Sequence, residues 1–183
     1  MKRVLLILSE GFEEMEAVTP LDLLRRAGVE AVAASTGPGL VVAGGRGVKV
    51  QADRLLEDCL RETFDMLILP GGPGMDRLRK DARVTELVRR SHAANVPIAA
   101  ICAAPVILAD AGVAQQHRIT SFPAREAELS PVAKAYLKDR VVVDGKVITS
   151  RGAGTAEEFA LALIAYLEGP AAAETVRAQI VAR

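Results

Sequence analysis

From Ile98 to Pro105 the chain reads I-A-A-I-C-A-A-P, and this segment sets the expected architecture. Its first four residues are apolar and suit a buried strand, while the residues after Cys102 are small and lead into an apolar helix pattern. We therefore expect Cys102 at a corner between a strand and a helix. The positive end of that helix favours a thiolate and lowers a cysteine pKa from about 8.5. Two interpretations of Cys102 stay open on this segment alone: a reactive nucleophile or an inert, packed thiol.

Strands and helices alternate on both sides of this segment. Strands are predicted at 3–8, 29–35, 64–69, 98–101 and near 119. Helices are predicted at 14–27, 84–94, 105–111, 131–137, 155–168 and 171–181. Short antiparallel pairs are predicted at 41–42 with 48–50 and at 141–143 with 147–149. This alternation predicts an α/β fold with a doubly wound, mostly parallel sheet, whose functional site lies outside the carboxyl ends of the strands.

The composition narrows the classes of partner. The chain has 183 residues and no visible linker, so we expect a single domain over 1–183. Aromatic residues make up only 3%, which argues against an aromatic platform for nucleic acid. Lys plus Arg and Asp plus Glu both number 23, so no net field attracts nucleic acid or an anionic membrane. Small or neutral partners are expected.

The two cysteines and the first residues indicate a cellular compartment. Cys59 and Cys102 cannot form a disulfide framework and lack the spacing of a zinc site, so we expect a reducing cytoplasm and no metal. The opening M-K-R-V-L-L-I-L-S-E has too short an apolar run for a signal peptide or a membrane span, and it fits a first strand.

Glu16 is the acidic residue with the strongest case for a chemical role. Glu13 and Glu14 beside it are expected to be solvated acids that complement the start of a helix. Glu16 instead shares a helical face with Pro20 and Leu23, which should point inward. A buried carboxyl tends to stay protonated. If Glu16 lies against Cys102, the expected pair is a thiolate beside a neutral glutamic acid, which provides a nucleophile and a proton donor.

Two glycine-rich turns were considered as ligand sites. In Pro70-Gly71-Gly72, Gly72 is a candidate to hold an oxyanion together with Ala103, with a purely structural turn as the alternative. The run Gly152-Ala153-Gly154 lacks the third glycine of a dinucleotide loop, so nucleotide binding is rejected and no cofactor is expected. His92 and His117 fit surface positions, so no Cys-His triad is expected.

Five segments in this order and spacing resemble one known family. They are E-G-F-E-E-M-E-A-V (10–18), L-D-L-L-R-R-A-G (21–28), L-I-L-P-G-G (67–72), A-A-I-C-A-A-P (99–105) and T-S-R-G-A-G-T (149–155). Together they resemble the ThiJ/PfpI superfamily, in the branch of the Parkinson-disease protein deglycase and bacterial ThiJ-like relatives. The resemblance implies a flavodoxin-like sandwich, usually a homodimer, in which the cysteine at the corner is reactive.

The resemblance also assigns roles to residues of this chain. Cys102 takes the nucleophile position, Glu16 its partner acid, and Gly72 and Ala103 the backbone donors around the thiolate. Arg46 and Arg151 match arginines near the site or the dimer contact.

The implied activities are a glutathione-independent glyoxalase and a deglycase acting on modified proteins or nucleotides. Their substrate is a small aldehyde or a glycated group. The alternative is an oxidative-stress sensor or redox-regulated chaperone, in which Cys102 is oxidised to a sulfinate.

Two positions depart from the family pattern. Phe122 stands where the human branch has a histidine, although some bacterial relatives also have phenylalanine, so Glu16 is expected to move protons alone. Ala103 stands where protease-like branches have a histidine directly after the cysteine, so a peptidase or amidotransferase lacks its base here.

Overall fold

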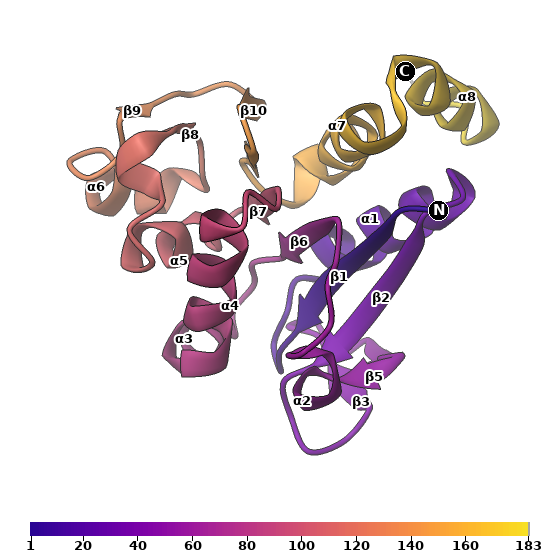
Figure 1. Cartoon of the computed structure of the whole chain (residues 1–183), viewed down its shortest axis with the longest axis horizontal. Coiled ribbons are helices and arrows are strands. Elements are labelled where there is room, and N and C mark those ends of the chain that lie inside the picture. The colour runs from indigo at the N-terminus through magenta and orange to yellow at the C-terminus, as the bar shows by residue number, and fades with distance from the viewer. Residues whose placement is uncertain (183) are drawn as a thin grey trace.

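The computed structural model describes residues 1–182, and a parallel sheet runs through its centre (Figure 1). Within those residues the sheet has seven strands in the order β10-β11-β7-β6-β1-β2-β5. Neighbouring strands are parallel except for the β10–β11 hairpin. The strands are β1 (Arg3–Leu8), β2 (Glu30–Ser35), β5 (Arg54–Leu55), β6 (Met66–Leu69), β7 (Ile98–Ile101), β10 (Val141–Asp144) and β11 (Val147–Ser150).

Helices cover both faces of this sheet and bury an apolar core on each side. The α-helices are α1 (Glu14–Arg26), α2 (Leu56–Cys59), α3 (Met75–Lys80), α4 (Ala82–Ala93), α5 (Pro105–Asp110), α6 (Glu126–Leu129), α7 (Ala156–Glu168) and α8 (Pro170–Gln179). One core cluster joins α1, α7 and α8 to the sheet, and the other joins α2 through α6 to the opposite face (Figure 1). The doubly wound, flavodoxin-like prediction is therefore confirmed.

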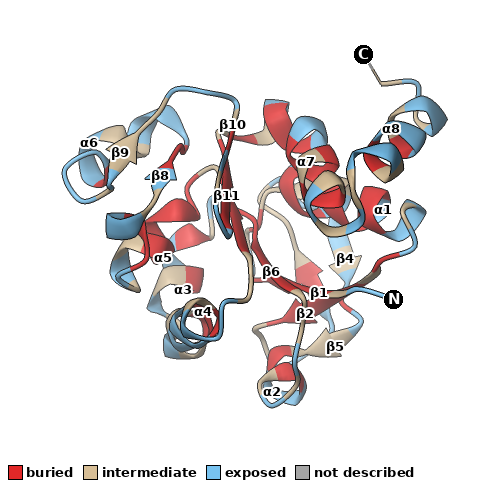
Figure 2. Ribbon diagram, turned by 45° about the horizontal axis from the view of Figure 1, so that its top comes forward, coloured by how far each residue is buried: buried red, intermediate tan, exposed pale blue. Residues whose placement is uncertain are grey.

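The inner strands are buried because their sequences are apolar on both faces. β6 and β7 are buried at every position, as Figure 2 shows for the centre of the molecule. Such unbroken apolar runs are what a parallel strand needs when helices cover it on both sides. The register pairs Leu5 with Leu67 and Leu69 with Ala100, which aligns the carboxyl ends of β1, β6 and β7.

The predicted antiparallel pairs are also present, whereas one predicted helix is wrong. β3 (Val41–Ala43) pairs with β4 (Lys49–Gln51) in a separate ribbon. The helix expected at 131–137 is absent: α6 ends at Leu129, and β9 (Ala135–Tyr136) pairs instead with β8 (Arg118–Ile119). The Lys134 N–H donates to the Ala114 carbonyl and the Leu137 N–H to the Ile119 carbonyl, so backbone groups that a helix over 131–137 would use are bonded to the segment around β8 instead.

The order of the strands brings three distant loops to one edge. β1 lies between β2 and β6, so the chain reverses its direction of winding between β1 and β6. The loops that follow β1, β6 and β7 meet at this carboxyl edge, which is where doubly wound sheets bind ligands. No helix within residues 1–182 is long and apolar enough to cross a membrane.

Candidate active site

Cys102 occupies a strained corner directly after β7. Its backbone φ is +64°, a left-handed conformation that is uncommon for a residue other than glycine and costs of order 1–3 kcal/mol. Two hydrogen bonds hold it there: its N–H donates to the Ser150 carbonyl (2.9 Å), and its carbonyl accepts from the Phe122 N–H (2.8 Å). The predicted corner is thus present, and the thiol is partly exposed rather than sealed in the core.

Glu16 points inward from the first turn of α1 and is 1% exposed, as its place on the apolar face predicted. The Glu13 carboxylate caps the helix by accepting from the Glu16 N–H (2.8 Å). The Glu16 side chain accepts from the Gly71 N–H through Oε2 (2.9 Å). Its other oxygen, Oε1, has no hydrogen-bond partner among the atoms of residues 1–182. One carboxylate oxygen is therefore held by the backbone, and the carboxyl also interacts with the Cys102 thiol.

The acid and the thiol shift the pKa values of each other. Burial raises the pKa of Glu16 to about 7, and the interactions with Cys102 and the Gly71 N–H oppose this shift. Burial raises the pKa of the Cys102 thiol, and a charged Glu16 raises it further, while the Ala103 N–H lowers it. The predicted lowering of the thiol pKa is therefore wrong when Glu16 is charged, because burial and the neighbouring charge outweigh the backbone donors. Because burial disfavours both charges and the Glu16 charge disfavours the thiolate, we expect Glu16 and Cys102 to carry one negative charge between them rather than two.

The glycine pair after β6 allows this close approach. A Cβ added to Gly71 would lie 2.9 Å from both Cys102 Cβ and Glu16 Oε2, so a side chain there would separate the acid from the corner. Gly72 has φ +126° and packs instead against the backbone of Gly11 and Glu13. The role of the Gly72 N–H as an oxyanion donor stays a prediction. The contact of Gly71 with Glu16 was not predicted, although the doubled glycine was a signal for both positions.

Gly152, which the sequence analysis considered only as part of a nucleotide loop, also lines the site. A Cβ built on Gly152 would lie 4.0 Å from Cys102 Sγ, 3.9 Å from Glu16 Oε1 and 3.5 Å from the Phe122 ring. These distances are ordinary contacts, so the glycine leaves an open space bounded by sulfur, carboxyl and ring. Phe122 is 47% exposed and forms the outer wall of that space.

Three other residues predicted for the site, Ala103, Arg151 and Arg46, lie in three different segments of the chain. Ala103 follows Cys102 and its N–H interacts with the thiol. Arg151 directly precedes Gly152, and its Nη1 is buried without a hydrogen-bond partner within residues 1–182. Arg46 lies in the β3–β4 turn, where its N–H donates to Glu14 Oε1 (2.6 Å) and its side chain to the Gly45 carbonyl (3.3 Å). Within the described part of the chain, no group of three or more His, Cys, Asp or Glu residues could hold a metal ion.

The fold and the site define a class: a doubly wound α/β protein with a strained cysteine corner facing a buried glutamic acid. Residues 2–166 match the DJ-1/PfpI family, and the chain belongs to it. This confirms the family resemblance seen in the sequence.

Relatives cover nearly the whole chain. Protein dj-1beta of Drosophila melanogaster is 41% identical over 170 residues, which cover 92% of this chain and 90% of that protein. Glutathione-independent glyoxalase DJR-1.2 of Caenorhabditis elegans is 36% identical over 169 residues, which cover 91% of this chain and 89% of that protein. The solved structure of oxidized Toxoplasma gondii DJ-1 superposes with a TM-score of 0.95 at 35% identity, covering 100% of this chain and 99% of that one.

Some relatives are much longer than this chain. Protein DJ-1 homolog B of Arabidopsis thaliana is 36% identical over 169 residues, yet the match covers only 38% of that protein.

Proposed function

We propose that this chain, acting as one domain over residues 1–183, converts small dicarbonyls such as methylglyoxal into hydroxy acids without glutathione. The observation that carries the proposal is the Glu16 carboxyl, which is 1% exposed, has a pKa raised to about 7 and lies beside the strained Cys102. A pKa near the working pH suits a group that both gives and takes a proton. The glyoxalase name of the C. elegans relative supports this reaction class.

The first step is addition of the Cys102 sulfur to the aldehyde carbon. The thiolate forms a C–S bond, and the carbonyl oxygen takes the electron pair and then the Glu16 proton. The product is a hemithioacetal, and Glu16 is left as a carboxylate. The Ala103 and Gly72 N–H groups act as donors to the developing oxyanion.

The second step moves hydrogen between adjacent carbons. The Glu16 carboxylate removes the proton from the carbon bonded to sulfur, which gives an enediolate. It then returns this proton to the neighbouring carbon, while the hydroxyl proton moves to the neighbouring oxygen. The result is a thioester of the hydroxy acid on Cys102. Water then hydrolyses the thioester, which releases lactate from methylglyoxal and restores the thiol. Oxidation and reduction balance within the substrate, so no redox cofactor is required.

Deglycation is an extension of the same chemistry. Adducts of dicarbonyls with thiols and amines form reversibly at first, so consumption of the free aldehyde also reverses them. We therefore treat release from early protein or nucleotide adducts as a consequence of the glyoxalase reaction.

The test is conversion of methylglyoxal to lactate in the absence of glutathione. The parent chain should turn over, Cys102→Ser should lose turnover, and Cys59→Ser should retain it, because Cys59 is fully buried in α2 away from this edge. An inactive parent, or a Cys102→Ser variant as active as the parent, would overturn the proposal.

A second candidate is a redox sensor or redox-regulated chaperone that uses the same thiol. It is favoured by the partly exposed Cys102 and the unpartnered Glu16 Oε1, since a neutral Glu16 can donate to a sulfinate oxygen. Peroxide titration with intact mass measurement separates the candidates. Two oxygens gained selectively at Cys102, with negligible aldehyde turnover, would favour the sensor.

We further propose a homodimer, in the cytoplasm, that meets through α1 and the β3–β4 ribbon. Both elements carry exposed apolar side chains: Met15, Val18, Val41 and Val48. Burial of these residues removes apolar surface from water, which favours association. Light scattering should give a dimer for the parent chain and a monomer for the double variant Met15→Glu, Val48→Glu; a monomeric parent would refute this assembly.

A further inference from the structure

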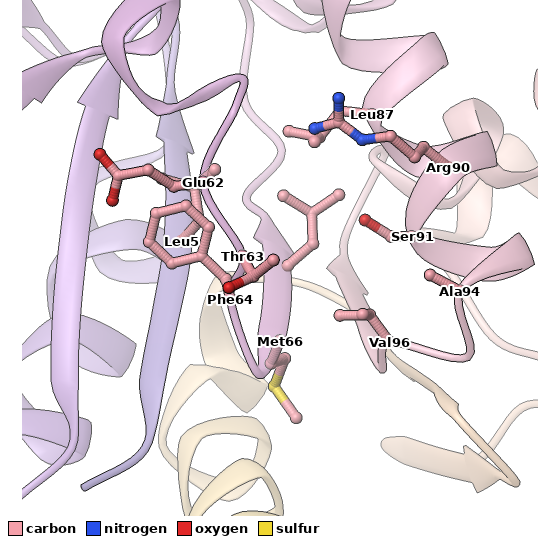
Figure 3. Close-up of a pocket in the computed structure, with 11 residues that line it drawn as sticks. Leu5, Glu62, Thr63, Phe64, Met66, Leu87, Arg90, Ser91, Ala94 and Val96 are labelled. Carbon is pink, nitrogen blue, oxygen red and sulfur yellow. The ribbon is translucent and has the colours of Figure 1, made fainter.

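A second hollow lies at the opposite edge of the sheet from Cys102. Figure 3 shows this cavity between α4 and the segment that enters β6. Its volume is about 180 Å³. The walls are mainly apolar and include Leu5, Met66, Leu67, Leu87 and Val96. An apolar cavity of about 150 Å³ is large enough to bind benzene, so this one accommodates a single six-membered ring.

Two polar side chains of α4, those of Arg90 and Ser91, line the cavity. Ser91 is 9% exposed, and its hydroxyl points into the hollow in Figure 3. The Arg90 guanidinium reaches over one end of the cavity and donates to the Leu60 carbonyl (2.6 Å). In the described part of the chain Arg90 has no carboxylate partner. The Ser91 hydroxyl and the guanidinium of the exposed Arg90 thus lie at one apolar space.

Glu62 also lines the cavity, and its negative charge is already paired with two arginines. Glu62 pairs with Arg3 (3.0 Å) and with Arg54, so one carboxylate is shared by two guanidinium groups. Since Glu62 is taken, Arg90 is the group whose charge an incoming ligand would match. A charge-assisted hydrogen bond to such a group is stronger than a neutral one.

We propose that this cavity binds a monocyclic aromatic carboxylate of the benzoate class. The ring fills the space between Leu5, Leu67 and Leu87, and the carboxylate accepts from the Arg90 guanidinium and the Ser91 hydroxyl. Hydrophobic burial of the ring provides affinity, and the two donors provide orientation and selectivity for an anion.

The experiment is calorimetric titration of the full chain with benzoate and, as a neutral analogue, benzyl alcohol. The parent should bind benzoate saturably at one site. Arg90→Met should weaken benzoate by about tenfold or more, which corresponds to loss of a charged hydrogen bond, and leave benzyl alcohol nearly unchanged. Arg89→Met is the matched control, because Arg89 lies on the same helix and donates to a backbone carbonyl, that of Asp110 (3.2 Å). It should bind both compounds as the parent does.

Two further variants test whether a loss of binding comes from the cavity itself rather than from unfolding, and whether benzoate binding is independent of the catalytic centre. Ser91→Leu should fill the cavity and abolish binding of both compounds while the circular dichroism spectrum stays native. Cys102→Ser should bind benzoate as the parent does, because the two sites lie at opposite edges. The proposal is overturned by absence of saturable binding to the parent, by equal loss of both compounds in Arg90→Met, or by unchanged binding in a folded Ser91→Leu.

Discussion

Cys102 and Cys59 are the same side chain in two different settings. Cys59 ends helix α2, is 0% exposed and packs in the apolar cluster on one face of the sheet. Cys102 lies in a positive-φ corner, is partly exposed and faces a carboxyl. Burial raises the pKa of both thiols. At Cys102 the charge of Glu16 adds the next largest contribution, whereas at Cys59 the largest charge effect is that of Arg54, which opposes the shift.

The difference shows that burial by itself does not couple a cysteine to an acid. At Cys59, desolvation leaves a neutral thiol packed in the apolar cluster, and the charged neighbours Arg54 and Glu62 act on its pKa in opposite directions. At Cys102, desolvation acts on two ionisable groups together, so that a proton on one determines the charge of the other. Two backbone hydrogen bonds, to Ser150 and from Phe122, hold the strained Cys102 corner at the edge of the sheet.

The largest effect is expected from Glu16→Gln, which leaves Cys102 in place and removes its acid. Turnover of methylglyoxal should fall by about two to four orders of magnitude, because glutamine cannot carry the proton. Alkylation of Cys102 by iodoacetamide at about pH 8 should instead become faster, since the charge that raises the thiol pKa is gone. A parallel fall in both rates would mean that Glu16 only supports the local structure.

Alkylation of the parent chain compares the two cysteines directly. Iodoacetamide should modify Cys102 at least about a hundredfold faster than Cys59, because Cys59 reacts only after local opening of the structure. Peptide mass spectrometry after timed quenching gives both rates in one sample. Equal rates under native conditions, or modification of Cys59 first, would contradict the contrast between the two settings.

The stability of the chain should report the raised pKa of Glu16. In the folded chain this pKa is about 7, against an ordinary value of 4.5, so the proton contributes stability that is complete below 4.5 and lost as the pH rises through 7. As the pH rises from about 5 to about 8, the parent loses this contribution and Glu16→Gln does not. The unfolding free energy of Glu16→Gln should therefore increase by roughly 2 kcal/mol relative to that of the parent.

Urea titrations at the two pH values measure this gain. Glu14→Gln is the control, because the pKa of Glu14 lies below its ordinary value and its contribution is lost only at lower pH. A pH-independent difference between parent and Glu16→Gln would show that the carboxyl stays ionised throughout.

Gly152→Ala tests whether the space above Cys102 holds the substrate. The added Cβ fits without a clash but contacts Cys102 Sγ, Glu16 Oε1 and the Phe122 ring, so we expect roughly tenfold lower kcat/KM for methylglyoxal, of the order that a single misfit methyl group causes. Glyoxal, which is smaller, should lose less. Gly154→Ala is the control, since nothing lies within 4 Å of its added Cβ. Equal kinetics in both variants would place the substrate elsewhere.

The smallest effect concerns backbone strain. The variant Cys102→Gly should be about 1 kcal/mol more stable than the variant Cys102→Ala, because glycine tolerates a positive φ. At position 59 the order should reverse by about the same amount, because that residue is helical. Thermal unfolding of the four variants checks both signs. Alanine more stable than glycine at both positions would argue against strain at Cys102.

Several features of the fold follow from local sequence. The apolar runs of β6 and β7, the corner at Cys102 and the inward face of α1 were predicted because periodicity and residue type determine them locally. The helix expected at 131–137 is absent because the extended pairing of Tyr136 with Ile119 outweighs the local helical preference of this segment.

What the sequence by itself determined is the set of elements, their alternation and the two side chains most suited to chemistry, Cys102 and Glu16. Only the tertiary structure decided that Gly71 rather than Gly72 contacts them both, that Gly152 leaves the space over the sulfur, and that the thiol pKa rises. These depend on distances between loops that lie far apart in the chain. A pKa or an open space is set by everything that surrounds a group, whereas sequence periodicity reports only which face of an element is buried.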